Sequence, residues 1–237
     1  MGISLYTLIL NNQLKGNTIM VDNNTIKANA RAQLGGNIFA ENWLMILVAY
    51  LIYSAISGIA STVTAGLATI FIVGPLEFGL ARICIKRACG EPKVDFMDMF
   101  KGFTDNFMGS MLLGLLQGLL IALWSLLFIV PGVLKSYSWA LSFYIQQDDP
   151  SKDWKTCLDE SAAMMYGHRW QLFCIDFTMF LWSLLGVLAC GIGVLFVLPY
   201  QYMSHANFYL ALKASREPAP TYEANFTQND SDNTTQL

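Results

Sequence analysis

The stretch that decides the fold runs from Ser125 to Pro150 and reads SLLFIVPGVLKSYSWALSFYIQQDDP. A long apolar run breaks at Val130-Pro131-Gly132, takes a lysine at Lys135, and then becomes apolar again. Proline removes a backbone donor and disfavours helix at the residue before it, and glycine permits a turn. The order predicts that Pro131 and Gly132 form the outer tip of a helical hairpin that enters a bilayer, turns and returns.

The composition places the chain among integral membrane proteins. Its residues are 54% hydrophobic and 13% charged, and the charged share is about half of that in a soluble domain. The formal net charge of −3 gives no basic excess for a nucleic-acid partner. The five cysteines include no CxxC motif, which argues against a zinc site or a disulfide framework.

Six apolar segments are expected to be helices because a membrane crossing takes roughly 20 helical residues. They are Trp43–Thr62, Gly66–Ile85, Phe107–Val130, Gly132–Gln147, Gln171–Ala189 and Val194–Leu212. The fold class predicted is therefore all-α, a polytopic membrane helical bundle of about six transmembrane helices in three hairpins. We expect further breaks or kinks at Gly74-Pro75, at Gly191 and Gly193, and at Pro199. The fourth segment is short for a full crossing.

The distribution of the basic residues predicts which ends of these helices face the cytoplasm. Positive charge collects on the cytoplasmic side of membrane proteins. With the N-terminus inside, every Lys and Arg of the 14 except Lys135 falls in an inner segment. The predicted location is a bacterial plasma membrane, multi-pass, with both termini in the cytoplasm.

Two inner segments have the pattern of amphipathic helices that lie in the membrane surface. In VDFMDMFKGFTDNF, phenylalanines recur at positions 96, 100, 103 and 107. In DDPSKDWKTCLDESAAMMYGHRW, Asp149 suits an N-cap, Pro150 the first helical position and Gly167 the C-terminal cap. The apolar face of this second helix is Trp154, Cys157, Leu158, Ser161 and Met165. The alternative is an ordinary cytosolic helix that packs on the bundle.

The ends of the chain are expected to lie outside the membrane domain, which we place at 26–213. Residues 1–25 are a leader, either disordered or the product of a mis-annotated start. Lys15-Gly16 can be encoded by a ribosome-binding sequence shortly before Met20, so Met20 is the other candidate start. Residues 214–237 are rich in Asn, Asp, Thr and Pro, and we predict a disordered cytoplasmic tail.

An ordered set of motifs carries a family resemblance. GPLEFGLARICIKRACGE, MFKGF, LWSLLFIVPGVLKSYSWALSFYIQQDDP, ESAAMMYGHRWQLFCIDFTMFLW and GIGVLFVLPY together resemble the domain-of-unknown-function 975 family, polytopic membrane proteins of low-GC Gram-positive bacteria. The resemblance covers about Ile26–Lys213 and implies location and architecture, since the family has no established activity. More distantly, the proline-glycine hairpin and the acidic helix after it are similar to membrane domains attached to glycerophosphodiester phosphodiesterases.

Ionisable residues inside the predicted spans are the candidate polar or lipid site, because bare charge in lipid is costly. Glu77, Arg82, Asp176 and His205 would line a polar cavity for a proton, an ion or a lipid headgroup. The structural alternative pairs Asp176 with Arg82, Lys86 or Arg169, and leaves Glu77 protonated or hydrogen-bonded. Lys135 either reaches outer-leaflet phosphates, with Tyr137 and Trp139 as interface anchors, or acts as a functional cation in a cavity.

Three function classes follow from these residues. HExxH, GxSxG, Walker and GxGxxG motifs are missing, and the two histidines are far apart in sequence, so we expect no catalytic residues, metal site or cofactor. The first class is a non-enzymatic protein that organises or senses membrane lipids or supports a membrane partner. The alternative is a small transporter or channel with a polar cavity around Glu77 and Asp176. The third is an intramembrane enzyme, for which no nucleophile and base are recognisable.

Overall fold

The computed structural model describes residues 22–34, 41–63, 67–91, 95–127, 129–188 and 192–216, and in these ranges the regular structure is helical, without a strand. The prediction of an all-α fold is confirmed. The elements are α2 (Asn23–Gln33), α3 (Glu41–Val63), α4 (Leu67–Ala88), η1 (Phe96–Phe100, a 3₁₀ helix), α5 (Lys101–Thr104), α6 (Phe107–Leu127), α7 (Ile129–Ser138), α8 (Ser142–Asp148), α9 (Trp154–Met164), α10 (Arg169–Leu188) and α11 (Ile192–Arg216).

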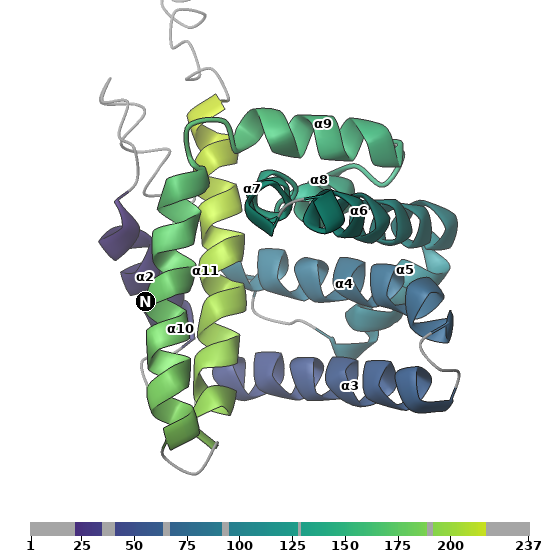
Figure 1. Cartoon of the computed structure of the whole chain (residues 1–237). Helices are drawn as coiled ribbons and strands as arrows, with labels where there is room; N and C mark the ends of the chain where they lie inside the picture. Colours follow the sequence, from purple (N-terminus) through teal and green to yellow (C-terminus); the bar gives the residue numbers. More distant parts are fainter. Residues whose placement is uncertain are drawn as a thin grey trace, which may run out of the picture.

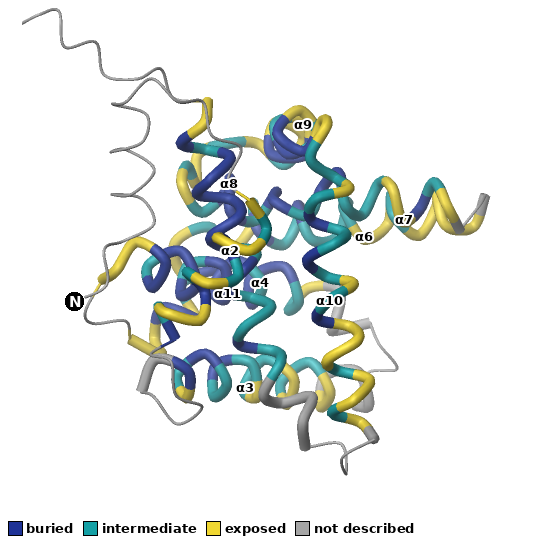
Figure 2. Tube along the Cα trace, turned by 90° about the vertical axis from the view of Figure 1, so that its left-hand side faces the viewer, coloured by how far each residue is buried: buried dark blue, intermediate teal, exposed yellow. Residues whose placement is uncertain are grey.

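The long helices form three hairpins, α3–α4, α6–α7 and α10–α11. In Figure 1, α3, α4, α6 and α9 are stacked one above the other, and α10 and α11 run crosswise along one side of the stack. Figure 2 shows α6–α7 projecting to one side while the far end of α10 points downward. The hairpins therefore converge at one end and splay at the other.

Two of the described helices are long and apolar enough to cross a membrane, over Phe107–Leu126 and Arg169–Val187, and Trp43–Ile59 is a shorter apolar segment. The predicted bundle of about six transmembrane helices is therefore not confirmed by the described residues. The predicted second span, Gly66–Ile85, illustrates why fewer membrane-spanning helices are found than the sequence predicted. In the second half of α4, Leu76, Phe78, Leu80 and Ile83 are fully buried against other helices, so their apolar character serves a protein core. Phe71, in the first half of α4, is exposed.

Glycines let the backbones of neighbouring helices touch along α4. A Cβ atom at Gly79 would overlap the backbone carbonyl of Met99 in η1, and one at Gly102 would overlap the carbonyl of Pro75. At Gly74 a Cβ would meet Ser110, and at Gly114 it would meet Gly74, where α6 crosses α4. Small residues permit this approach, and the contacts hold η1, α5 and α6 against α4.

The opening stretch folds differently from its prediction. Helix α6 ends at Leu127 and α7 begins at Ile129, so Pro131 and Gly132 lie inside α7 and not at the hairpin tip. Pro131 is in the first turn of α7, where a backbone N–H has no intrahelical acceptor and proline is tolerated. Gly132 is buried against Ser125 of α6. The predicted fourth helix is two helices, α7 and α8, joined by a turn over residues 139–141.

The other predicted breaks are absorbed into helices. Pro75 lies inside α4 and Pro199 inside α11, and both helices continue through them. The predicted interruption at Gly74-Pro75 is therefore wrong. The close packing of Pro75 on Gly102 holds this part of α4 in place although proline removes one helical hydrogen bond. Gly193 falls in the first turn of α11, and Gly191 lies outside the described residues.

Helix α9 packs on the protein, as in the alternative to a surface helix. Cys157, Leu158, Ser161 and Met165 are buried, and Ser161 accepts from the amide of Leu141 and donates to the carbonyl of Ser138. The helix begins at Trp154, after Asp153. The predicted cap, Asp149, instead accepts from the Ser151 amide in a turn that contains Pro150, because an Asx side chain also stabilises turns. The C-cap of α9 is Met165, so the predicted cap at Gly167 is wrong. Gly167 instead supplies a φ of 83° in the turn that follows.

The helices at the two ends of the described chain pack together. In α2, Ile26 and Ala30 are buried, and Asn207 of α11 donates to the Gln33 side chain at 2.7 Å. Lys27 donates to Thr178 of α10 at 3.0 Å. The predicted boundaries at residues 25 and 214 fall inside α2 and α11, and the rest of the leader and tail lies outside the described residues.

The contact between Gly79 and Met99 predicts that a residue larger than glycine at position 79 destabilises the protein. Gly79→Ala should lower the free energy of unfolding by about 1–3 kcal/mol, since an added methyl group overpacks the contact. Gly118→Ala is the matched control, because a Cβ at Gly118 meets no atom within 4 Å. Thermal denaturation in detergent measures both variants. Equal melting temperatures for the two would contradict the close contact.

Candidate functional site

Asp176 and His205 form the shortest charged contact among the predicted site residues. His205 Nε2 lies 2.6 Å from Asp176 Oδ1, within hydrogen-bond distance. Gln201 Nε2 donates to the same oxygen at 3.4 Å, and the Tyr137 hydroxyl hydrogen-bonds Asp176 from α7. The structural pairing expected for Asp176, with Arg82, Lys86 or Arg169, is wrong, since α10 and α11 face each other and bring His205 to it.

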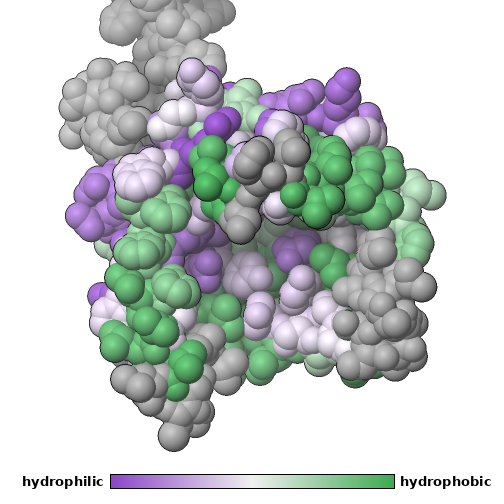
Figure 3. Space-filling view, in the orientation of Figure 1, coloured by the Kyte–Doolittle hydropathy of each residue, from purple (hydrophilic) through white to green (hydrophobic). Residues whose placement is uncertain are grey.

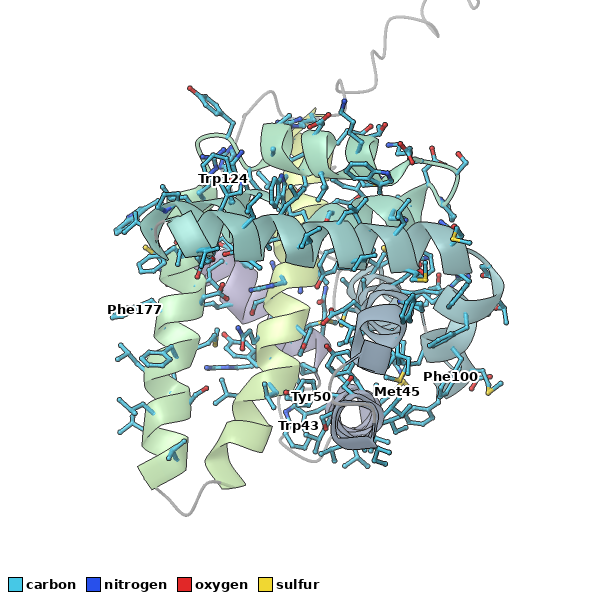
Figure 4. All side chains as sticks on the ribbon, turned by 45° about the vertical axis from the view of Figure 1, so that its right-hand side comes forward. Trp43, Met45, Tyr50, Phe100, Trp124 and Phe177 are labelled. Carbon is cyan, nitrogen blue, oxygen red and sulfur yellow. The ribbon has the colours of Figure 1, made fainter. Side chains whose placement is uncertain are left out.

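Glu77 lies beside tyrosines from neighbouring helices. Its carboxyl group hydrogen-bonds the hydroxyl of Tyr53 on α3 and is close enough to His205 to interact electrostatically. Tyr202 of α11 lies near Glu77 and packs on Tyr50, with ring centroids 5.6 Å apart. Figure 4 shows Tyr50 between α3 and α11. The hydrogen bond of Glu77 agrees with the structural alternative that the sequence analysis gave for this residue.

These groups make up one polar region where the three hairpins meet, which we call the junction cluster. Its members are Tyr53 on α3, Glu77 on α4, Tyr137 on α7, Asp176 on α10, and Tyr202 and His205 on α11. Side chains of Asp176 and His205 keep 18% and 20% of their exposure, so they are reachable from solvent. Figure 3 shows a recess with hydrophilic residues between the apolar surfaces of α10 and α6. The cluster can hold a polar group by hydrogen bonds and can exchange a proton.

Arg82 does not belong to this cluster, contrary to the sequence interpretation. It forms ion pairs instead with two carboxylates that precede α6 in the sequence. Its Nη1 lies 3.2 Å from Asp105 Oδ2, and its Nε lies 3.6 Å from Asp98 Oδ1. Lys86 Nζ donates to Asp98 Oδ2 at 2.9 Å, and Lys101 Nζ lies 3.5 Å from Oδ1. We call Arg82, Lys86 and Lys101 the basic cluster. It forms because η1 lies along α4 and turns Asp98 toward it.

The cations control the ionisation of Asp98, whose side chain is only 5% exposed. Burial alone would raise the pKa of this carboxyl group. The hydrogen bond and charge of Lys86, with the backbone of Asp95 and the charge of Lys101, outweigh burial and lower the pKa below its usual range. Asp98 is therefore an ionised anchor for η1 at neutral pH.

Lys135 lies between two indole rings. Its Nζ is 5.5 Å from the ring centroid of Trp124 and 5.2 Å from that of Trp139, within the range of cation–π attraction. Trp139 is buried and its carbonyl accepts from Gln117, so the expectation of a surface anchor at this residue is wrong. In the part of the chain that the structure describes, Lys135 forms no ion pair with a member of either cluster, although Tyr137 on the same helix belongs to the junction cluster.

Sequence inspection missed the partners of the candidate residues. Sequence inspection did not select Tyr53, and it gave Tyr137 the role of an interface anchor, which is common for a tyrosine in an apolar segment. Asp98 was not selected either, since it stands among the phenylalanines of an amphipathic segment. Its position three residues before Lys101 was the available signal. Among the described residues, no group of three or more His, Cys, Asp or Glu side chains is placed to hold a metal ion.

The fold and the two clusters define an all-helical protein with two helices suited to a bilayer and a buried polar junction. The chain belongs to the family described as protein of unknown function (DUF975), whose profile matches residues 20–149 and 131–216. No curated protein and no solved structure matches the chain. The more distant similarity to membrane domains of phosphodiesterases therefore stays a prediction.

The pKa of Asp98 gives a pH-dependent prediction. Asp98→Asn should destabilise the protein by on the order of 2 kcal/mol at neutral pH, less than for a fully buried pair because the cations reach solvent. Since the folded pKa is depressed, the stabilisation is complete above the ordinary value of about 4 and is lost as pH falls through the folded pKa. The difference from the parent should shrink below about pH 4.

Denaturation at a series of pH values measures this difference. Asp159→Asn on the exposed side of α9 is the control and should change little at any pH. If the free energies of unfolding of Asp98→Asn and the parent differed by the same amount down to the lowest pH, the anchoring role of Asp98 would be contradicted.

Proposed function

We propose that this protein is a multi-pass, non-enzymatic protein of the bacterial plasma membrane that binds a membrane lipid at the junction cluster and so organises or senses lipid, or supports a membrane partner. The observation that carries the proposal is the polar junction between two exposed apolar helix faces. A lipid has the matching chemistry, with a polar headgroup next to acyl chains.

The exposed apolar faces support a membrane location. On α10, Phe180, Trp182, Leu184 and Val187 are exposed, and on α6 the most exposed apolar side chain is Leu126. Figure 4 shows Phe177 pointing outward from α10. Soluble monomers rarely expose contiguous apolar surface of this kind. Trp170, exposed at the start of α10, suits the aromatic belt at an interface.

The finer topology is part of the same proposal: six membrane helices in three hairpins, with both termini in the cytoplasm. The three hairpins and the inner placement of nearly all basic residues support it. It requires the hairpins, which run crosswise in Figure 1, to align in the bilayer. Lipid would then cover apolar surface that now faces outward at the splayed ends.

The second candidate is a small transporter or channel. It is favoured by the Asp176–His205 contact together with Glu77, because acid and histidine chains inside membrane helices are typical of proton relays. Both candidates use the junction cluster, and they differ in the molecule that it holds.

Cysteine labelling tests the topology. In a cysteine-free background, a cysteine in place of Ser151 should react with a membrane-impermeant maleimide only from the cytoplasmic side. The natural Cys190, restored alone in the outer turn that the sequence predicts between α10 and α11, should react only from the outside. Ser151 is exposed and lies in a predicted inner segment, so access to the two positions depends on the side of the membrane. Labelling of both positions from the same side would contradict the proposed crossing by α10.

Native mass spectrometry of protein released from lipid nanodiscs tests the function. We expect the parent to retain a lipid and Glu77→Gln and Asp176→Asn to lose it about tenfold, the equivalent of one hydrogen bond to a charged group. Ser136→Ala is the control, because the Ser136 hydroxyl donates only to the Val133 carbonyl of its own helix. A retained water-soluble solute, lost in the same variants, would favour the transporter. Bulk lipid carried equally by all forms would contradict both candidates.

A further inference from the structure

An exposed apolar edge precedes α6. Phe96, Met97 and Phe100 of η1, and Phe107 and Met108 at the start of α6, are all exposed. Figure 4 shows Phe100 at the outer edge of the protein. The five side chains lie within a segment of thirteen residues whose backbone is pinned to α4 by Gly79 and Gly102. The edge is therefore fixed in position, and it is of the aromatic and methionine type that inserts into a membrane interface.

The basic cluster lies directly behind this edge and keeps unused donors. Only Lys86 makes a short hydrogen bond to Asp98, while Lys101 and Arg82 Nε stand 3.5 and 3.6 Å from the other carboxylate oxygen. Arg82 Nε is buried and has no hydrogen-bond acceptor among the described residues, so it is Lys101 that offers its donors to the outside. The Lys101 side chain is 40% exposed, and its ammonium has three protons to donate.

The charge of the ion-paired group is also unbalanced. Three cations face two carboxylates, Asp98 and Asp105. Asp95, a third carboxylate of the segment, is exposed and lies outside these ion pairs; it accepts from the amide of Met97 at 3.2 Å. The spare donors of Lys101 lie beside apolar side chains, so the complementary molecule carries a phosphate or similar acceptor next to a hydrocarbon region.

We propose that Arg82 and Lys101 bind the phosphate of an anionic phospholipid at the cytoplasmic surface, while the apolar edge of η1 and α6 enters the acyl-chain boundary. Asp98 holds the cations and η1 together, and the lipid phosphate takes the free protons of the Lys101 ammonium and the Arg82 Nη protons that Asp105 does not use. The inference rests on the membrane location proposed above and concerns a site separate from the junction cluster.

The chemistry favours a lipid over a soluble anion. A free phosphate would gain nothing from the exposed Phe96, Phe100 and Phe107, whereas a phospholipid covers them with its glycerol and chains. Each basic residue near an anionic membrane surface strengthens binding about fivefold. Such attraction weakens as salt is added.

Nanodiscs of phosphatidylcholine, with or without phosphatidylglycerol, provide the test. We expect the parent to retain phosphatidylglycerol in native mass spectrometry, and Lys101→Gln to lower the retained fraction about fivefold. Hydrogen exchange over residues 95–108 should be slower in the anionic discs than in the neutral ones. Lys101→Gln leaves the Lys86–Asp98 hydrogen bond intact, so the variant is expected to fold.

Lys155→Gln on the exposed side of α9 is the matched control, with the same loss of charge away from the basic cluster. Equal retention by Lys101→Gln and the parent, or equal exchange in the two kinds of disc, would overturn the inference. Protection of residues 95–108 by inorganic phosphate in neutral discs would also overturn it, by identifying a soluble ion as the ligand. Failure of the junction proposal is separate, because that proposal depends on Glu77 and Asp176.

Discussion

The reciprocal backbone contact between α4 and the η1–α5 segment is the constraint on which the rest of the structure depends. Gly79 admits the carbonyl of Met99, and Gly102 admits the carbonyl of Pro75. Two contacts in opposite directions fix both the position and the direction of the segment along α4. They place Asp98 beside Lys86, and they set the point at which α6 begins and crosses α4 at Gly74. A side chain at either glycine would push these elements apart.

A second constraint acts where the hairpins meet. Glu77 and Asp176 lie in helices whose other side chains are mostly apolar, and a buried carboxylate without partners is strongly destabilising. Their partners come from other hairpins, Tyr53 from the first, Tyr137 from the second and His205 from the third. The polar junction therefore favours convergence of the hairpins at that point, and it is also the surface on which a ligand can be recognised. Stability and the proposed function share the same atoms.

Local sequence patterns predicted most of the helices and the presence of three hairpins, because long apolar runs depend on neighbours in the chain. They also predicted the buried face of α9 from Cys157 to Met165. What failed was decided by residues far apart in sequence. Proline was taken as a break, yet Pro75 stays in a helix that Gly102 packs against. Arg82 was expected near Asp176, either in one polar cavity or as one of three possible partners, yet it pairs with Asp98 of η1. No periodicity in α4 indicates which other helix covers its second half.

The position of Lys135 between Trp124 and Trp139 bears on how the chain reaches its final place. In the proposed topology this lysine is the one basic residue on the outer side, so the hairpin that carries it has to be moved through the hydrocarbon during biogenesis. Two indole faces offer its ammonium an attraction of up to about 2 kcal/mol when water is removed. The α6–α7 hairpin thus carries within itself a partial compensation for the cost of removing water from this ammonium.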